Sequence, residues 1–127
     1  MSSIHQEVVF DARPARVYQA LVDAGEFSRL TGAPSTGTGS EGDAFTAFGG
    51  RITGRQIELV PDRLVVQAWR AKTWRAGQYS IARFELRPEG EKTRLVFDHD
   101  GFPEDQREHL AAGWTANYWE PMRRHLG

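Results

Sequence analysis

Residues 102–126, FPEDQREHLAAGWTANYWEPMRRHL, decide the fold of this 127-residue chain. Pro103 followed by Glu104 and Asp105 indicates a helix start, because proline suits the first turn and acidic side chains suit the positive end of the helix dipole. No cluster of glycine and proline follows until the chain is nearly finished. The sequence therefore predicts one long helix over Glu104–His125, which would span roughly 33 Å at about 1.5 Å per residue.

The predicted helix has a wide and unusually aromatic face. At 100° per residue, one half of the helical wheel carries Leu110, Trp114, Tyr118, Pro121, Met122 and His125. The other half carries Ala112, Ala116, Glu120 and Arg123, with Trp119 and Leu126 at the flank. Pro121 removes a backbone donor and is expected to bend the last turn. Such a helix needs a large concave partner, which the preceding residues have to supply.

The N-terminal third predicts one strand and two short helices. Apolar and polar residues alternate over Ile4–Phe10, which indicates a strand with one buried face. Pro14 is placed to open a first helix, Gly25 breaks it, and Glu26–Leu30 forms a second. The segment Thr31–Gly42 is rich in Gly, Ser and Thr and is predicted to be a mobile loop.

The middle of the chain predicts further strands. They are Ala44–Phe48, Arg51–Val60, Arg63–Arg70, Gln78–Leu86 and Thr93–His99. A parity slip between Ile52 and Ile57 predicts a β-bulge near Gly54. Ala71–Gly77, which contains Trp74, is predicted to be a second mobile loop. Hairpin-length connections make the sheet antiparallel, so we expect an α+β fold in which a curved sheet of about six strands wraps around the C-terminal helix.

Composition narrows the class of protein. The length predicts one domain over residues 1–127. With 16 Lys and Arg against 17 Asp and Glu, the charge gives no indication of a nucleic-acid partner. The chain has no cysteine, which fits a reducing compartment, and no segment approaches the roughly 18 apolar residues of a membrane span. We expect a soluble, cytoplasmic protein without membrane insertion.

An ordered set of short motifs resembles a known family. The motifs are Gly49–Gly54, Leu59–Pro61, Gln67–Arg70 with Trp74 and Gly77 following, Gly113-Trp114 and Tyr118-Trp119. Together they resemble the C-terminal domain of the activator of heat-shock-protein-90 ATPase and its single-domain bacterial relatives, in the START-like, SRPBCC helix-grip superfamily. The resemblance runs from about Ile4 to Leu126.

The resemblance implies a cavity between sheet and long helix, but it does not imply one activity. Relatives in the superfamily bind lipids or hormones, carry polyketide-type substrates, or act on chaperones. The family's usual Trp-Pro-x-Gly loop is Trp74-Arg75-Ala76-Gly77 here. The eukaryotic co-chaperone also carries an N-terminal domain without counterpart in these 127 residues, so we expect the chain alone not to stimulate the chaperone's ATPase.

The residues on inward faces are the predicted lining of this cavity. They are Phe45, Ile52, Val65, Gln67, Trp69, Ala82, Phe84, Leu95, Phe97, Leu110, Trp114 and Tyr118. Core packing explains their aromatic members equally well, so the sequence leaves open whether the cavity is hollow or filled. Gln67, together with Gln56, would place polar groups on the inner face, where they could orient a ligand or a water. One of the two predicted loops is expected to gate the cavity.

No constellation of residues indicates catalysis. The four histidines, His5, His99, His109 and His125, lack metal-ligand spacing. The run Asp98-His99-Asp100 could suggest a general base, but alternation places His99 at the end of a core face, at the cavity rim, and no nucleophile is identified. The sequence therefore predicts no catalytic residue, no cofactor and no metal.

Three functions are compatible with these observations. The first hypothesis is a non-enzymatic binding domain that holds a small apolar molecule between sheet and helix. The second is a module that interacts with a heat-shock-protein-90 chaperone and modulates its ATPase, which an exposed patch around Trp74 and Thr31–Gly42 would favour. The third is an enzyme that uses the same cavity.

Overall fold

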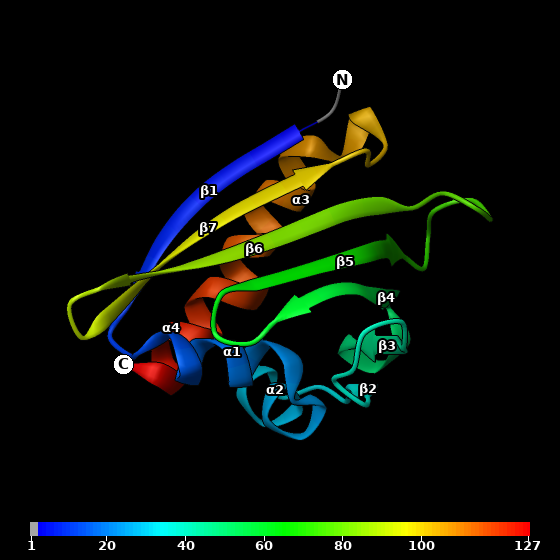
Figure 1. The fold of residues 1–127 in the computed structure, drawn as a ribbon. Helices are drawn as coiled ribbons and strands as arrows, with labels where there is room; N and C mark the ends of the chain where they lie inside the picture. The colour runs from blue at the N-terminus through cyan, green and yellow to red at the C-terminus, as the bar shows by residue number, and fades with distance from the viewer. Residues whose placement is uncertain (1–2) are drawn as a thin grey trace.

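A curved sheet lies against a long C-terminal helical segment, and two short helices cover one end of the grip (Figure 1). The structure is a computed structural model that describes residues 3–127. The sheet has seven strands in the order β1-β7-β6-β5-β4-β3-β2, and all neighbours are antiparallel. The predicted α+β helix-grip architecture is therefore confirmed.

The elements begin and end as follows. The strands are β1 (Ser3–Phe10), β2 (Thr36–Gly37), β3 (Ala44–Ala47), β4 (Ile52–Val60), β5 (Leu64–Ala71), β6 (Ser80–Glu89) and β7 (Lys92–Asp100). The helices are α1 (Pro14–Val22), α2 (Ala24–Thr31), α3 (Arg107–Trp114) and α4 (Glu120–Leu126). Short turns of other helix types are η1 (Phe48–Gly50), η2 (Glu104–Gln106) and η3 (Thr115–Trp119), the last a π-helical turn.

The short strand β2 was not predicted, because it lies inside a segment predicted to be a loop. Thr36 and Gly37 pair with Thr46 and Phe45 of β3, and the hydroxyl oxygens of Thr36 and Thr46 are 2.8 Å apart. The prediction of a loop was wrong at these two residues, because pairing with an edge strand leaves no hydrophobic periodicity to detect. Mobility of the rest of Thr31–Gly42 stays a prediction.

The break between the two short helices is at Asp23, not at Gly25 as predicted. Asp23 leaves the helical region with φ −84° and ψ 110°, and its carboxylate accepts a hydrogen bond from the Glu26 backbone N–H at 3.0 Å. Gly25 is an ordinary residue in the first turn of α2. The capping side chain, rather than the glycine, therefore sets where α2 begins.

The predicted β-bulge exists, but three residues further along the chain. The register shifts between Gln56 and Glu58, which turns Ile57 outward to 48% exposure. Gly54 is required for another reason: a Cβ there would lie 2.0 Å from the Ala68 carbonyl oxygen and 2.7 Å from the Phe45 ring. The glycine allows close packing and is not the bulge itself.

The C-terminal segment is helical over the predicted range, but its irregular turn precedes Pro121 rather than following it. The Glu120 N–H bonds the carbonyl of Thr115, five residues back. Pro121 has no N–H for the carbonyl of Asn117, which favours this wider turn. The turn also rotates Trp119 inward, to 5% exposure, so its predicted place at the flank of the wheel was wrong.

The corner where α1, α2 and α4 meet is fixed by one buried carboxylate. Glu26 is 3% exposed and lies 2.8 Å from both Arg16 Nη1 and His125 Nε2. Burial acts to raise the pKa of Glu26, but the hydrogen bonds from Arg16 and His125 outweigh it and lower that pKa. The two short helices and the chain end are thereby held together at neutral pH.

Trp114 lies at the centre of the core. Its side chain is 2% exposed, and its ring centroid lies 4.2 Å from that of Phe97 and 4.1 Å from that of Tyr118. Its indole N–H donates to His99 Nδ1 at 3.0 Å. Trp114 is therefore a central contact between the long helical segment and the sheet.

We expect Trp114→Ala to lower the free energy of unfolding by about 3–5 kcal/mol, the range for a buried large aromatic side chain. Urea denaturation measures the loss. Tyr79→Ala is the control, because Tyr79 is 52% exposed and should change stability by less than about 1 kcal/mol. A loss below about 1 kcal/mol for Trp114→Ala would contradict the central role of this residue.

Candidate functional site

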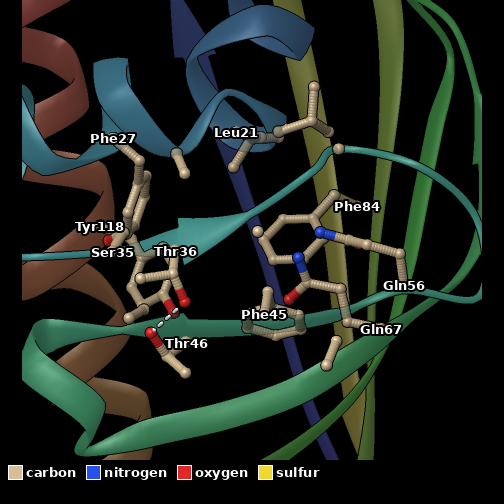
Figure 2. A pocket seen from close by; sticks show the side chains of 16 residues that line it. Leu21, Phe27, Ser35, Thr36, Phe45, Thr46, Gln56, Gln67, Phe84 and Tyr118 are labelled. Carbon is tan, nitrogen blue, oxygen red and sulfur yellow. Dashed lines mark hydrogen bonds between the residues drawn. The ribbon is translucent and has the colours of Figure 1, made fainter.

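Two of the hollows between the sheet and the helices contain predicted lining residues, and the smaller of these two is nearly filled. This inner cavity lies among α1, α2, β3 and the middle of the sheet (Figure 2) and has a volume of about 30 Å³. Figure 2 shows the cross-strand partners Gln56 and Gln67 pointing into it beside Phe45 and Phe84. The volume suits about one water molecule, so this cavity is too small for an organic ligand.

The larger hollow lies between the η1 end of β4, the end of β5 and the long helical segment, and we call it the helix groove. Its volume is about 590 Å³, within the range of small-molecule sites. It is lined by Phe48, Arg51, Ile52, Trp69, Ala71, Lys72, Thr73, Gln106, His109, Leu110, Gly113, Trp114, Asn117 and Tyr118.

The floor of the helix groove is aromatic and rigid. Trp69, Trp114 and Tyr118 are at least 94% buried, and the Trp69 and Trp114 ring centroids are 5.3 Å apart. Trp69 Nε1 donates to the Tyr118 hydroxyl at 3.4 Å. Burial raises the pKa of Tyr118 far above its usual range, so the hydroxyl stays neutral. The floor therefore offers flat apolar surface without a charge.

The rim of the helix groove is polar and partly cationic. Arg51 and Lys72 extend from the sheet side, where the Lys72 backbone N–H bonds the Arg51 carbonyl at 2.7 Å. Gln106, His109 and Asn117 face them from the helical segment. Among the described residues that line the groove, none is acidic. An apolar floor with a few polar groups at the edge is the usual composition of a ligand site.

Phe48 contributes backbone strain beside the groove. Its φ of 54° is left-handed, a conformation that bulky residues rarely adopt. Its ring packs against Phe27 and Tyr118, with centroid distances of 5.7 and 5.4 Å. Strain of this kind typically costs about 1–3 kcal/mol and gathers at ligand sites, which supports the groove as the functional part of the fold.

The predicted lining residues divide among three places. Ile52, Trp69, Leu110, Trp114 and Tyr118 line the helix groove. Phe45, Gln67 and Phe84 line the inner cavity, which Tyr118 also reaches. Val65, Ala82, Leu95 and Phe97 line neither hollow and are at most 1% exposed. The predicted single cavity is therefore interrupted, because aromatic side chains fill the middle of the grip.

Sequence reasoning missed the rim. Arg51 was predicted only as the first residue of the strand Arg51–Val60, and Lys72 lies two residues beyond the predicted strand Arg63–Arg70. On the helical wheel, His109 lies off the apolar half, and the polar Asn117 lies at its edge. The antiparallel register of β4 and β5, which pairs Ile52 with Ala71, brings the two cations together. The only signal in the sequence was a basic residue before the first strand of the hairpin and another after its second strand. Whether the two come together depends on the register of the strands.

His99 is buried in the core and does not lie at the cavity rim as predicted. It is 0% exposed, accepts from Trp114 Nε1 at Nδ1, and lies 2.7 Å from Ser80 Oγ through Nε2. Because an indole N–H can only donate, the neutral ring carries its proton on Nε2 and donates it to Ser80. The Ser80 hydroxyl in turn donates to the Trp69 carbonyl at 3.1 Å. In this arrangement His99 cannot act as a base toward Ser80.

The predicted loop residue Trp74 is also buried. It is 7% exposed, and its ring lies edge-on to Trp69 at 5.6 Å. The guanidinium of Arg70 donates to the carbonyl oxygens of Trp74 and Arg75, which fastens the loop to β5. The Trp74 side chain is therefore not part of an exposed patch of the kind that would have favoured a chaperone-binding surface.

Two further features of the described chain concern metals and membranes. Within residues 3–127, no group of three or more His, Asp or Glu side chains could hold a metal ion. Over the same residues, no helix combines the length and the apolar character that crossing a membrane requires.

We expect His99 to stay neutral well below neutral pH, because burial lowers its pKa from 6.5 to about 4. Between these values the unfolded chain binds a proton at His99 that the folded protein does not. The free energy of unfolding should therefore decrease as the pH falls through this window, by up to about 3 kcal/mol. The stabilising contribution is complete above pH 6.5.

An NMR titration of the four imidazole Cε1–H signals measures this directly. His99 should show no midpoint above pH 5, whereas hydrogen bonds to Asp98 and Glu7 raise the pKa of exposed His5. Urea denaturation of His99→Gln across the same pH range should show a free energy of unfolding that no longer decreases through this window on account of residue 99. A midpoint near 6.5 for His99 would refute its buried, neutral state.

Comparisons with known proteins agree with this architecture. Residues 11–127 match the family described as "Activator of Hsp90 ATPase homolog 1-like protein". The human protein named "Activator of 90 kDa heat shock protein ATPase homolog 1" is 25% identical over 118 residues, which are 93% of this chain and 35% of that protein. A Dictyostelium discoideum homologue is 28% identical over 115 residues, which are 90% of this chain and 30% of that protein. The chain spans about a third of the length of these relatives.

Solved structures share the fold at low identity. The crystal structure of an HSP90 activator from Plasmodium falciparum matches with a TM-score of 0.91 and 24% identity, covering 100% of this chain and 97% of that chain. The solution structure of the Aha1 dimer from Colwellia psychrerythraea matches with a TM-score of 0.85 and 20% identity, covering 99% and 96%. At these identities the likeness establishes the fold alone.

Proposed function

Because the chain belongs to the family of Activator of Hsp90 ATPase homolog 1-like proteins, we propose that residues 1–127 act as one binding domain that holds a small apolar molecule in the helix groove. The observation that carries the proposal is the groove itself, with a volume of about 590 Å³ over the buried rings of Trp69, Trp114 and Tyr118. A pre-formed hollow with an aromatic floor binds flat apolar molecules without a large ordering cost.

The ligand contacts in this proposal come from both sides of the grip. Ile52 and Trp69 contribute from the sheet, and Leu110, Trp114 and Tyr118 contribute from the helical segment. The irregular η3 turn contains Tyr118 and lies directly beside the groove, and π-helical turns often accompany functional sites. The domain acts by binding in this proposal, since His99 has both ring nitrogens engaged and lines no hollow.

Gly113 allows the groove to be filled without damage to the fold. It lies in α3 and lines the groove, and a Cβ at this position would meet only the Asn117 side chain, at 3.7 Å. Gly113→Ala should therefore stabilise the helix by about 0.5–1 kcal/mol. Gly113→Leu gains the same backbone benefit and adds a branched side chain to the groove wall.

The test uses the neutral fluorescent probe N-phenyl-1-naphthylamine. We expect the wild type and Gly113→Ala to bind the probe with similar affinity, and Gly113→Leu to bind it at least about tenfold more weakly. Thermal unfolding of each variant checks that the fold is intact. Equal binding by Gly113→Leu and Gly113→Ala, or no binding by the wild type, would refute the groove as the binding site.

A second candidate function follows from the names of the relatives. The human and Dictyostelium discoideum relatives are named as homologues of an activator of the 90 kDa heat shock protein ATPase, and the match to the human protein covers 93% of this chain. The second proposal is a co-chaperone-like module that interacts with such a chaperone and modulates its ATPase. It ranks lower because Trp74 is buried and the net charge of −1 provides no strong field to steer association.

We expect the 127-residue chain, tested alone at micromolar concentration, not to stimulate the ATPase of its host's own chaperone several-fold. One module lacks the gain in effective concentration that a linked second module gives, often about 10²–10⁴-fold in affinity. A steady-state ATPase assay decides between the two functions. Several-fold stimulation would place the co-chaperone function first, and its loss in Gly113→Leu would show that the chaperone uses the helix groove.

A further inference from the structure

The rim of the helix groove carries two cations without partners. Arg51 and Lys72 are exposed and line the groove, and neither side chain has an ion pair or hydrogen bond with another residue in the range 3–127. The backbone bond from Lys72 to Arg51 makes them neighbours across the hairpin. Like charges at neighbouring cross-strand positions destabilise a sheet, so the stability of the fold does not explain this pair.

Three arginines on β6 and β7 are arranged differently. Glu85 lies between Arg83 and Arg87, with N–O distances of 3.1 and 2.9 Å. Arg94 pairs with Glu7 at 3.3 Å. These three arginines therefore have carboxylate partners, whereas Arg51 and Lys72 have none, and no acidic residue lines the groove around them. Asp105 and Glu108 are next to lining residues in the sequence, but neither lines the groove.

We infer that the ligand of the helix groove is an amphipathic anion: an organic carboxylate whose apolar body lies on the aromatic floor and whose head is bound by Arg51 and Lys72. This inference rests on the proposed binding function and names the chemical class of its ligand. A guanidinium beside an ammonium matches the planar, two-oxygen geometry and the charge of a carboxylate. The amides of Gln106 and Asn117 add polar partners on the opposite wall.

The arrangement separates charge from apolar surface along the groove. The floor residues Trp69, Trp114 and Tyr118 are buried, and the cations are exposed to water at the rim. A carboxylate can therefore bind the cations while it stays partly solvated, without the penalty of burying a charge. The apolar body then supplies most of the contact area.

The experiment measures displacement of N-phenyl-1-naphthylamine by two competitors of equal chain length, decanoate and decan-1-ol. A groove that recognised apolar surface alone would prefer the alcohol, because an ionised head without a partner is unfavourable there. We expect the opposite order, with half-displacement by decanoate at an about tenfold lower concentration.

Variants locate the head group. Arg51→Gln combined with Lys72→Gln should weaken displacement by decanoate at least about tenfold more than displacement by decan-1-ol. Arg75→Gln is the matched control, because Arg75 is exposed, lies in the same connection between β5 and β6, and does not line the groove. Its affinity for decanoate should stay within about twofold of the wild type.

The outcomes separate this inference from the function on which it rests. Probe binding that is lost in Gly113→Leu, with decanoate no better than decan-1-ol, would overturn the anion inference and leave the binding function intact. An equal effect of Arg75→Gln and the double variant would overturn it as well, because general charge rather than a head site would then be responsible. No probe binding by the wild type would refute the binding function itself.

Discussion

The fold depends on the indole of Trp114. Its ring packs on Phe97 at the centre of the contact between the long helical segment and the sheet, and its N–H fixes the orientation of His99 in β7. His99 in turn bonds Ser80 of β6, which bonds the Trp69 carbonyl of β5. One helical residue is thereby connected to three neighbouring strands through a chain of buried hydrogen bonds, and every polar atom in that chain is satisfied.

The same indole explains why the grip is hollow at one end. Phe84, Phe97 and Trp119 pack around Trp114 and fill the middle of the space between sheet and helix. What remains is an inner cavity of about 30 Å³ on one side and the helix groove on the other. A core that is filled at its centre gives the groove a rigid floor, which lowers the ordering cost of binding.

Charged residues also differ between the structural parts of the fold and the helix groove. On the outer face of β6, Glu85 lies between Arg83 and Arg87 and balances their charge. The buried carboxylate of Glu26 is paired with Arg16 and hydrogen-bonded to His125. The charges that hold these elements together are therefore paired, whereas Arg51 and Lys72, which have no ion pair among residues 3–127, lie where an apolar hollow opens to water.

The sequence by itself determined the element types, the antiparallel sheet, the long helix with its aromatic face and the family. Alternation and helical periodicity are local consequences of backbone geometry, so Ile4–Phe10 and Leu110–Met122 revealed their buried faces directly. Tertiary structure alone decided the place of the bulge, the wide turn that buries Trp119, and which inward residues line a hollow and which fill the core. It also decided that Arg51 meets Lys72. Those features depend on strand register and on the volumes of packed side chains, which act between residues far apart in the chain and leave no periodic trace in it.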